Sequence, residues 1–179
     1  MNVEILKHPT DEDWMLCKKC TLITISKDTD VPPKDEWKVK LLRANHSPIR
    51  TLQFCFRLTD VPYWVAMHIV RHVHATPFVS TQRDDRQNRY KRGEASQNAP
   101  VSMCWYMNAE ELITIAHKRL CSKAAEETRE LIRLICDKVV EVNPEFRGLL
   151  VPNCVYRGGL CDEFDCCGYN KTLKEGERI

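Results

Sequence analysis

The sequence lacks any long apolar run and any strong imbalance of charge. No segment approaches the roughly 18 consecutive uncharged apolar residues of a membrane-spanning helix, and residues 1–13 lack the basic and then apolar pattern of a signal peptide. The 27 lysines and arginines are balanced by 25 aspartates and glutamates, so no overall basic field favours non-specific nucleic-acid binding. We therefore expect a soluble, cytoplasmic protein without membrane contact or a nucleic-acid partner, in which any anion site is local.

Cysteine, in contrast, is abundant, with ten residues in the chain. In an exported protein this number would indicate a disulfide framework. Without an export signal we interpret the cysteines as reduced thiols, four of which have apolar neighbours typical of small core residues: Cys55, Cys104, Cys121 and Cys136. We predict no metal site.

A zinc-stabilised interaction protein is an alternative that the cysteine pattern leaves open. Four thiolates can form a tetrahedral structural zinc site. The candidate ligands are the pair in Cys17-Lys-Lys-Cys20 and a set in the tail, Cys154, Cys161, Cys166 and Cys167.

The length and the apolar content favour one domain over residues 1–179, with a Cys- and Gly-rich tail over residues 146–179. A chain of 179 residues with 43% hydrophobic content is long enough for one buried core. Apolar spacing predicts helices over residues 11–25, 34–43, 61–72, 108–120 and 122–143, and strands over residues 51–58, 78–82 and 101–107. Residues 83–99 are polar and read as a loop.

Several polar residues stand where helices are predicted to begin. Thr10 or Asp11 is expected to cap the first helix, and Asp60 the helix that carries Arg71 and His72 at its C-terminal end. Asn108 is followed three positions later by Glu111, a variant of the capping box. The last predicted helix is expected to start from Ser122.

The segment from Arg71 to Arg83 is the first that suggests chemistry. Two arginines, several hydroxyl groups and the backbone N–H groups of a turn can bind a phosphate, because hydrogen bonds from arginine to phosphate are charge-assisted and often bidentate. An Arg-His pair at a helix end can equally interact with the helix dipole without any ligand. The segment after Asn108 is similarly ambiguous: Asn108 is a cap or a ligand, and Glu127 and Arg129 can be a solvated helix face.

Taken together, the two segments resemble the flavin-dependent thymidylate synthase (ThyX) family. The family motif R-H-R-x-x-S-x-N-x-x-S-x-R-Y has the spacing of residues 71–84, with identities at Arg71, His72 and Arg83 and with threonine for serine at positions 76 and 81. Upstream, Ser47-Pro48 is similar to the family segment H-x-[ST]-P-x-E-H. Downstream, the pattern N-A-R-S-L…L-R…A-Q-x-E-I-R is in register with Asn108, Ala109, Leu112, Arg119, Ala124, Glu127 and Arg129.

The resemblance implies an α+β (α/β) fold with a mixed sheet flanked by long helices, and a homotetramer whose sites are shared between subunits. It implies transfer of a one-carbon unit from methylenetetrahydrofolate to dUMP, with FAD as cofactor and NADPH as reductant. Arg119 is the implied catalytic residue, beside the uracil ring. The implied FAD-binding residues are Ser47, Arg71, His72, Val73, Asn108 and Thr114. The implied dUMP-binding residues are His68, Arg71, Ser80, Thr81, Gln82, Arg83 and Arg119.

The sequence also departs from the family pattern. Val73 replaces the third residue of the R-H-R turn, and Glu110 stands where the family has a second flavin-contacting arginine. Only 23 residues separate Asp84 from Asn108, where the family inserts helices that carry a nucleotide-binding arginine. The charged loop of residues 85–92 either substitutes for that segment or is a solvated surface loop.

These departures keep two alternatives open. One is a relative of the family that binds a pyrimidine nucleotide without synthase activity. The other is a non-catalytic nucleotide- or nucleic-acid-binding module that uses the cations of the charged loop, Arg83, Arg86, Arg89, Lys91 and Arg92.

Overall fold

The structure is a computed structural model that describes residues 1–174, so residues 175–179 of the expected tail lie outside it. Its strands are β1 (Asn2–Lys7), β2 (Gln53–Pro62), β3 (Thr76–Val79) and β4 (Pro100–Asn108). Its α-helices are α1 (Asp11–Ile23), α2 (Asp35–Arg43), α3 (Tyr63–Ile69), α4 (Ala109–Arg119), α5 (Glu126–Val142) and α6 (Asn153–Tyr156). Short 3-10 helices include η1 (Ser47–Thr51), η2 (Arg92–Glu94), η3 (Pro144–Phe146) and η4 (Tyr169–Lys171).

The four strands form one sheet in the order β1-β2-β4-β3. Every strand pair is antiparallel, so the expected α+β fold is confirmed, but its sheet is antiparallel rather than mixed. In the central pair, Phe54 lies opposite Met107 and Phe56 opposite Trp105. These side chains share one face of the sheet and are buried, as the alternation along each strand requires.

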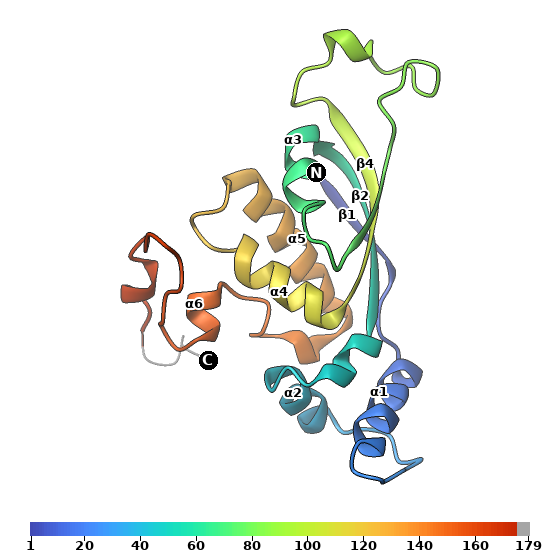
Figure 1. The fold of residues 1–179 in the computed structure, drawn as a ribbon, viewed down its shortest axis with the longest axis vertical. Coiled ribbons are helices and arrows are strands. Elements are labelled where there is room, and N and C mark those ends of the chain that lie inside the picture. Colours follow the sequence, from blue (N-terminus) through green and yellow to red (C-terminus); the bar gives the residue numbers. More distant parts are fainter. Residues whose placement is uncertain (175–179) are drawn as a thin grey trace.

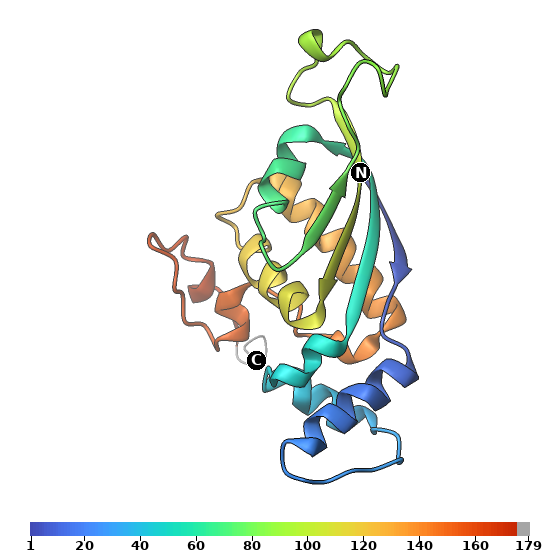
Figure 2. The same ribbon diagram turned by 45° about the vertical axis from the view of Figure 1, so that its right-hand side comes forward.

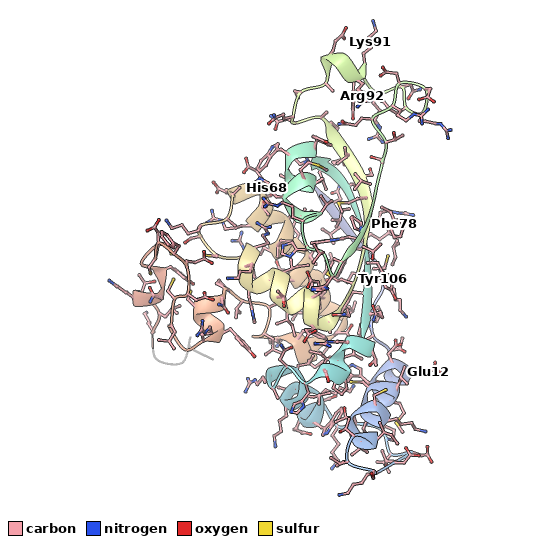
Figure 3. All side chains as sticks on the ribbon, viewed as in Figure 1. Glu12, His68, Phe78, Lys91, Arg92 and Tyr106 are labelled. Atoms are coloured by element: carbon pink, nitrogen blue, oxygen red, sulfur yellow. The ribbon has the colours of Figure 1, made fainter. Side chains whose placement is uncertain are left out.

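One face of the sheet is covered by helices, and the other is largely open. Helices α3, α4 and α5 lie on the covered face, whereas α1 and α2 lie at one end of the sheet (Figures 1 and 2). Helix α5 contributes a buried apolar stripe to the core, Leu131, Ile132, Ile135, Cys136 and Val139. On the open face, Phe78 is 64% exposed and Tyr106 is 37% exposed; Figure 3 shows both on the side of the sheet away from α4.

The helix expected over residues 61–72 is shorter than predicted at both ends. It ends at Ile69, so Arg71 and His72 lie in the turn after it rather than at its C-terminal end. At its start, strand β2 continues through Pro62. The backbone of Asp60 has a φ of 56°, and the register of β2 against β4 shifts there before Val61 pairs with Val101. This bulge lets the chain stay in the sheet after a conformation that is rare outside glycine. Asp60 therefore does not cap α3, which begins at Tyr63 after Pro62.

The predicted starts of the other helices are partly confirmed. Thr10 caps α1 in a capping box with Asp13, and Asn108 caps α4 by accepting from the backbone N–H of Glu111 at 2.9 Å. Ser122 does not cap α5, because residues 120–125 form a turn and the helix begins after Ala125. The other predicted strands and helices lie within a few residues of their expected bounds, whereas β1 and α6 were not predicted from the sequence.

The loop between β3 and β4 projects beyond the end of the sheet, with Lys91 and Arg92 near its tip (Figure 3). The tail residues with α6 lie beside α4 (Figure 1). Of the four thiols expected in the core, only Cys136 is buried, whereas Cys55, Cys104 and Cys121 are half-buried. Cys17, which the sequence pattern did not place in the core, is fully buried. None of the helices described is both long and apolar enough to cross a bilayer.

Candidate active site

The turn after α3 meets the end of α4 at a direct contact between His72 and Arg119. Arg119 is the last residue of α4, and its Nε donates to His72 Nε2 at 2.9 Å. Its Nη2 donates to the carbonyl oxygen of His68 at 3.0 Å. The ring of His68 in turn contacts the hydroxyl of Thr128 on α5, with 3.3 Å between Nδ1 and Oγ1. His68 and His72 thus lie together with Arg119, which is far from them in the sequence, and Thr128 of α5 contacts His68.

Arg119 keeps its positive charge without a carboxylate partner among residues 1–174. Both of its hydrogen-bond acceptors are neutral groups, an imidazole nitrogen and a backbone carbonyl, and it forms no ion pair with the described acidic side chains. Burial lowers the pKa of Arg119, and the positive charge of nearby Arg71 lowers it further. A partly desolvated guanidinium beside a second cation attracts an anion more strongly than a solvated one.

A cavity of about 310 Å³ opens beside this guanidinium. Its lining is rich in cationic and polar groups, with one acidic residue, Glu163, which faces Lys118 at 3.7 Å. Its lining residues include His72, Lys118, Arg119, Cys121 and Lys123. The cavity is large enough for part of a nucleotide, since ligand sites commonly measure about 300–1,000 Å³. Its chemistry suits an anionic ligand.

A second cavity, of about 500 Å³, lies at the N-terminal end of α4. Asn108 and Thr114, both implied in flavin binding, line it together with Asn45, Arg50, His74, Glu110 and Glu111. Arg50 and Glu110 form a bidentate pair, with Nε to Oε2 at 2.6 Å and Nη2 to Oε1 at 3.1 Å. The resemblance implies a cation at position 110. This chain has Glu110 there, but Arg50 on η1 places a guanidinium beside it.

Glu111 lines the second cavity and contacts His72, which lines the first, a contact that the sequence reasoning did not predict. Its side chain is 7% exposed, and Oε1 is 3.4 Å from Nδ1 of His72. The sequence pattern assigned Glu111 to a capping box. Its backbone N–H is capped by Asn108, but its carboxylate turns toward His72. A helical position that is charged and three residues after a cap gives no signal of this contact, because the partner comes from the turn after α3.

The residues at positions 80–83, which the resemblance implies in dUMP binding, do not line the cavity of Arg119 in the same chain. Ser80 and Thr81 line a separate cavity of about 210 Å³ with residues of the projecting loop. The guanidinium of Arg83 is held by Asp85, with Nε to Oδ1 at 2.9 Å and Nη2 to Oδ2 at 2.7 Å. Gln82 lies beside them, half-buried.

Two further residues that the resemblance implies in ligand binding are exposed. Arg71 is exposed near Arg119, and Val73 is 84% exposed. Ser47 is exposed on η1, the short helix that also carries Arg50.

The cysteines fall into separate groups. Cys17 lies in α1 and contacts the carbonyl oxygen of Pro48, whereas the tail thiols Cys154, Cys161 and Cys167 surround a small cavity together with Cys121. Within residues 1–174, no group of three or more His, Cys, Asp or Glu side chains is arranged to hold a metal ion. Neither candidate set of the zinc alternative, Cys17 with Cys20 or the tail cysteines, therefore forms such a group in the described part of the chain.

The chain was compared with protein families, curated proteins and solved structures. The family model described as "Thymidylate synthase complementing protein" matches residues 90–145. This segment contains Asn108, Glu111, Thr114, Arg119 and Thr128, but not the region of residues 71–84. No curated protein sequence matches the chain.

Two solved structures of ThyX from Helicobacter pylori have the same fold. The first, in complex with FAD and dUMP, has a TM-score of 0.66 at 13% identity, over 84% of this chain and 99% of that chain. The second, also with FAD and dUMP, has a TM-score of 0.67 at 14% identity, over 84% and 98% of the two chains. At such low identity these likenesses establish the fold, and the family model adds the sequence relationship over β4, α4 and α5. The chain thus has the fold of ThyX, and over residues 90–145 its sequence is similar to the family of thymidylate synthase complementing proteins.

Proposed function

We propose that the chain binds FAD and dUMP and transfers a one-carbon unit from methylenetetrahydrofolate to the pyrimidine, with NADPH as reductant. The observation that carries this proposal is the half-buried guanidinium of Arg119, which has only neutral hydrogen-bond acceptors and faces a cavity lined by cations. Such a group favours binding of an anion and stabilises negative charge that develops on a bound ring.

The two cavities suggest a division of roles. The cavity of His72 and Arg119 suits the nucleotide, because its lining offers Lys118, Lys123 and the free N–H groups of Arg119 to an anion. The cavity at the start of α4 suits part of a flavin. There, the oxygen of the Asn108 amide caps the helix, which leaves its NH₂ group as a donor. Arg50 also lines this cavity, with its charge balanced by Glu110. The bound flavin would supply the redox chemistry.

We infer that a complete site needs more than one protomer, which fits the proposed homotetramer. Ser80 and Thr81 line a cavity different from that of Arg119, and Arg83 follows them at the start of the projecting loop. A loop that extends beyond the end of its own sheet is available to a neighbouring molecule (Figure 1). In this arrangement the loop of one protomer brings its hydroxyls and arginines to the Arg119 cavity of another.

The proposal is tested by incubating the purified chain with FAD, NADPH, methylenetetrahydrofolate and dUMP. We expect thymidylate to form, and omission of FAD to abolish its formation. Binding of FAD and dUMP without thymidylate would instead favour the non-synthase relative. Failure to bind either ligand, together with salt-sensitive binding of oligonucleotides, would favour a binding module that acts through the exposed cations of the loop.

A further inference from the structure

A buried carboxylate stands directly behind the contact between His72 and Arg119. The side chain of Glu111 is 7% exposed, and that of His72 is 12% exposed. Carboxylates are rarely buried unless they are paired, because loss of hydration penalises the charged form. The polar group that faces Glu111 is Nδ1 of His72, 3.4 Å from Oε1.

The hydrogen-bond donors and acceptors at this contact determine which ring nitrogen of His72 carries the proton. Arginine donates hydrogen bonds and cannot accept them. Because Arg119 Nε donates to His72 Nε2 at 2.9 Å, Nε2 must present a lone pair. The proton of the neutral ring is therefore on Nδ1, the nitrogen that faces the carboxylate of Glu111.

The imidazole also separates the carboxylate from the guanidinium. Glu111 comes eight positions before Arg119 on α4, but the described contacts place His72 between them. A direct pair with Glu111 would neutralise Arg119. Through His72, the carboxylate orients the guanidinium, and the positive charge remains available to the cavity.

We propose that Glu111 is a positioning residue for the anion site: it holds the proton on His72 Nδ1, so that Nε2 fixes the orientation of Arg119 toward the cavity. The identity of the bound anion as a pyrimidine nucleotide rests on the proposed function. The orientation of Arg119 by Glu111 through His72 does not, since it follows from contacts within the ligand-free chain. Loss of the carboxylate would let the proton move to Nε2, where it would face the N–H of Arg119 and break the contact.

The first test is nuclear magnetic resonance of the ligand-free full chain labelled with ¹⁵N at histidine, with the signal of His72 assigned from a His72→Asn variant. The wild-type ring should show the Nδ1–H tautomer. Glu111→Gln, which keeps the side-chain size, should populate the Nε2–H tautomer. Glu110→Gln is the matched control, because Glu110 pairs with Arg50, and it should leave the His72 signal unchanged. A wild-type ring protonated on Nε2, or a Gln variant with unchanged ring signals, would overturn the proposal.

The second test is titration with dUMP. Glu111→Gln should weaken binding roughly tenfold, the size of one lost charge-assisted interaction, and Glu111→Asp should restore part of the affinity because it restores a carboxylate. Unchanged affinity in Glu111→Gln would contradict a positioning role. If the wild-type chain binds no dUMP, the proposed function fails, whereas the tautomer measurement still decides the role of Glu111.

Discussion

At the scale of single residues, the site depends on a guanidinium that is held by neutral partners. Arg119 uses Nε and Nη2 for His72 and for the carbonyl of His68. This leaves its other N–H groups for a ligand and fixes the plane of the group. A planar guanidinium held in this way presents its N–H donors in fixed directions, whereas the ammonium group of a lysine has the same charge on a flexible side chain.

We therefore expect Arg119→Lys to weaken dUMP binding roughly tenfold although the charge is retained, because the lysine cannot make both contacts and still face the cavity. Calorimetric titration measures the change. Arg133→Lys, at an exposed position of α5, is the control and should bind as the wild type does. Equal affinity in both variants would show that Arg119 does not contact the nucleotide.

The sequence predicted part of this site and missed the rest for a physical reason. His68, His72, Asn108, Thr114 and Arg119 were all proposed before the fold was known, and the fold brings His68, His72 and Arg119 into contact. Glu111 and Arg50 were not proposed, because their significance depends on partners from other elements. A capping pattern accounts for Glu111 within one helix and gives no sign of its contact with His72 in the turn after α3.

At the scale of secondary-structure elements, the sequence was most reliable where periodicity and a cap agree. Helices α1 and α4 begin after Thr10 and Asn108, as predicted. The prediction failed around Asp60, where a left-handed residue and a bulge extend β2. Apolar residues such as Val61 and Val65 suit a strand or a helix equally, and only the partner strand β4 decides between them.

The joint between α1 and the end of α5 depends on a buried polar network. Trp14 is 1% exposed, and its Nε1 donates to Glu145 at 2.7 Å. The amide of buried Asn143 donates to the same carboxylate and to the carbonyl of Pro9. Glu145→Ala should lower the free energy of unfolding by about 1–3 kcal/mol, because it leaves a buried indole N–H without its acceptor.

Urea denaturation measures this loss. Glu141→Ala removes a carboxylate that pairs with Lys138 at an exposed position, and it should change the free energy of unfolding by less than about 1 kcal/mol. If the two variants lose the same stability, the network does not hold the joint.

Helix α6 and the tail dock on α4 through His117, and this contact makes stability depend on pH. The ring centroids of His117 and Tyr156 are 4.3 Å apart, and His117 Nε2 is 3.2 Å from the carbonyl oxygen of Leu149. Burial lowers the pKa of His117 below its ordinary value of 6.5. The unfolded chain therefore binds the proton more readily than the folded chain, and stability rises with pH in this range.

The contribution of His117 is complete above pH 6.5 and is lost as the pH falls toward the folded-state pKa. We expect His117→Gln to show a smaller loss of melting temperature than the wild type as the pH is lowered from neutral. His46→Gln, at an exposed position, should follow the wild-type curve. A His117→Gln curve parallel to the wild type would mean that His117 does not cause the pH dependence.

At the scale of the whole molecule, the open face of the sheet and the projecting loop are the two features that support the proposed assembly. Phe78 and Tyr106 are exposed on the face of the sheet that the helices leave uncovered (Figure 3). Ser80 and Thr81, which the resemblance implies in dUMP binding, line a cavity other than that of their own chain's Arg119. Both features fit a protein whose site is completed by a second copy.

Sedimentation velocity should therefore show a species about four times the 20.9 kDa mass of one chain. Phe78→Ser should shift the distribution toward smaller species at low concentration, because it removes exposed apolar area from the open face. Thr59→Ser, on β2 away from this aromatic pair, should leave the distribution unchanged. A wild-type chain that sediments as a monomer at all concentrations would exclude a site shared between copies.

The adjacency of a flavin and a nucleotide is the central claim, and one spectroscopic titration tests it most directly. FAD is first added to the full-length chain, and dUMP is then titrated in while the visible absorbance of the flavin is recorded. We predict that the bound flavin spectrum shifts with saturation as dUMP enters the neighbouring cavity, and that Arg119→Lys requires a higher dUMP concentration for the same shift. A chain that binds no FAD, or a bound flavin whose spectrum is unchanged at saturating dUMP, would contradict the account.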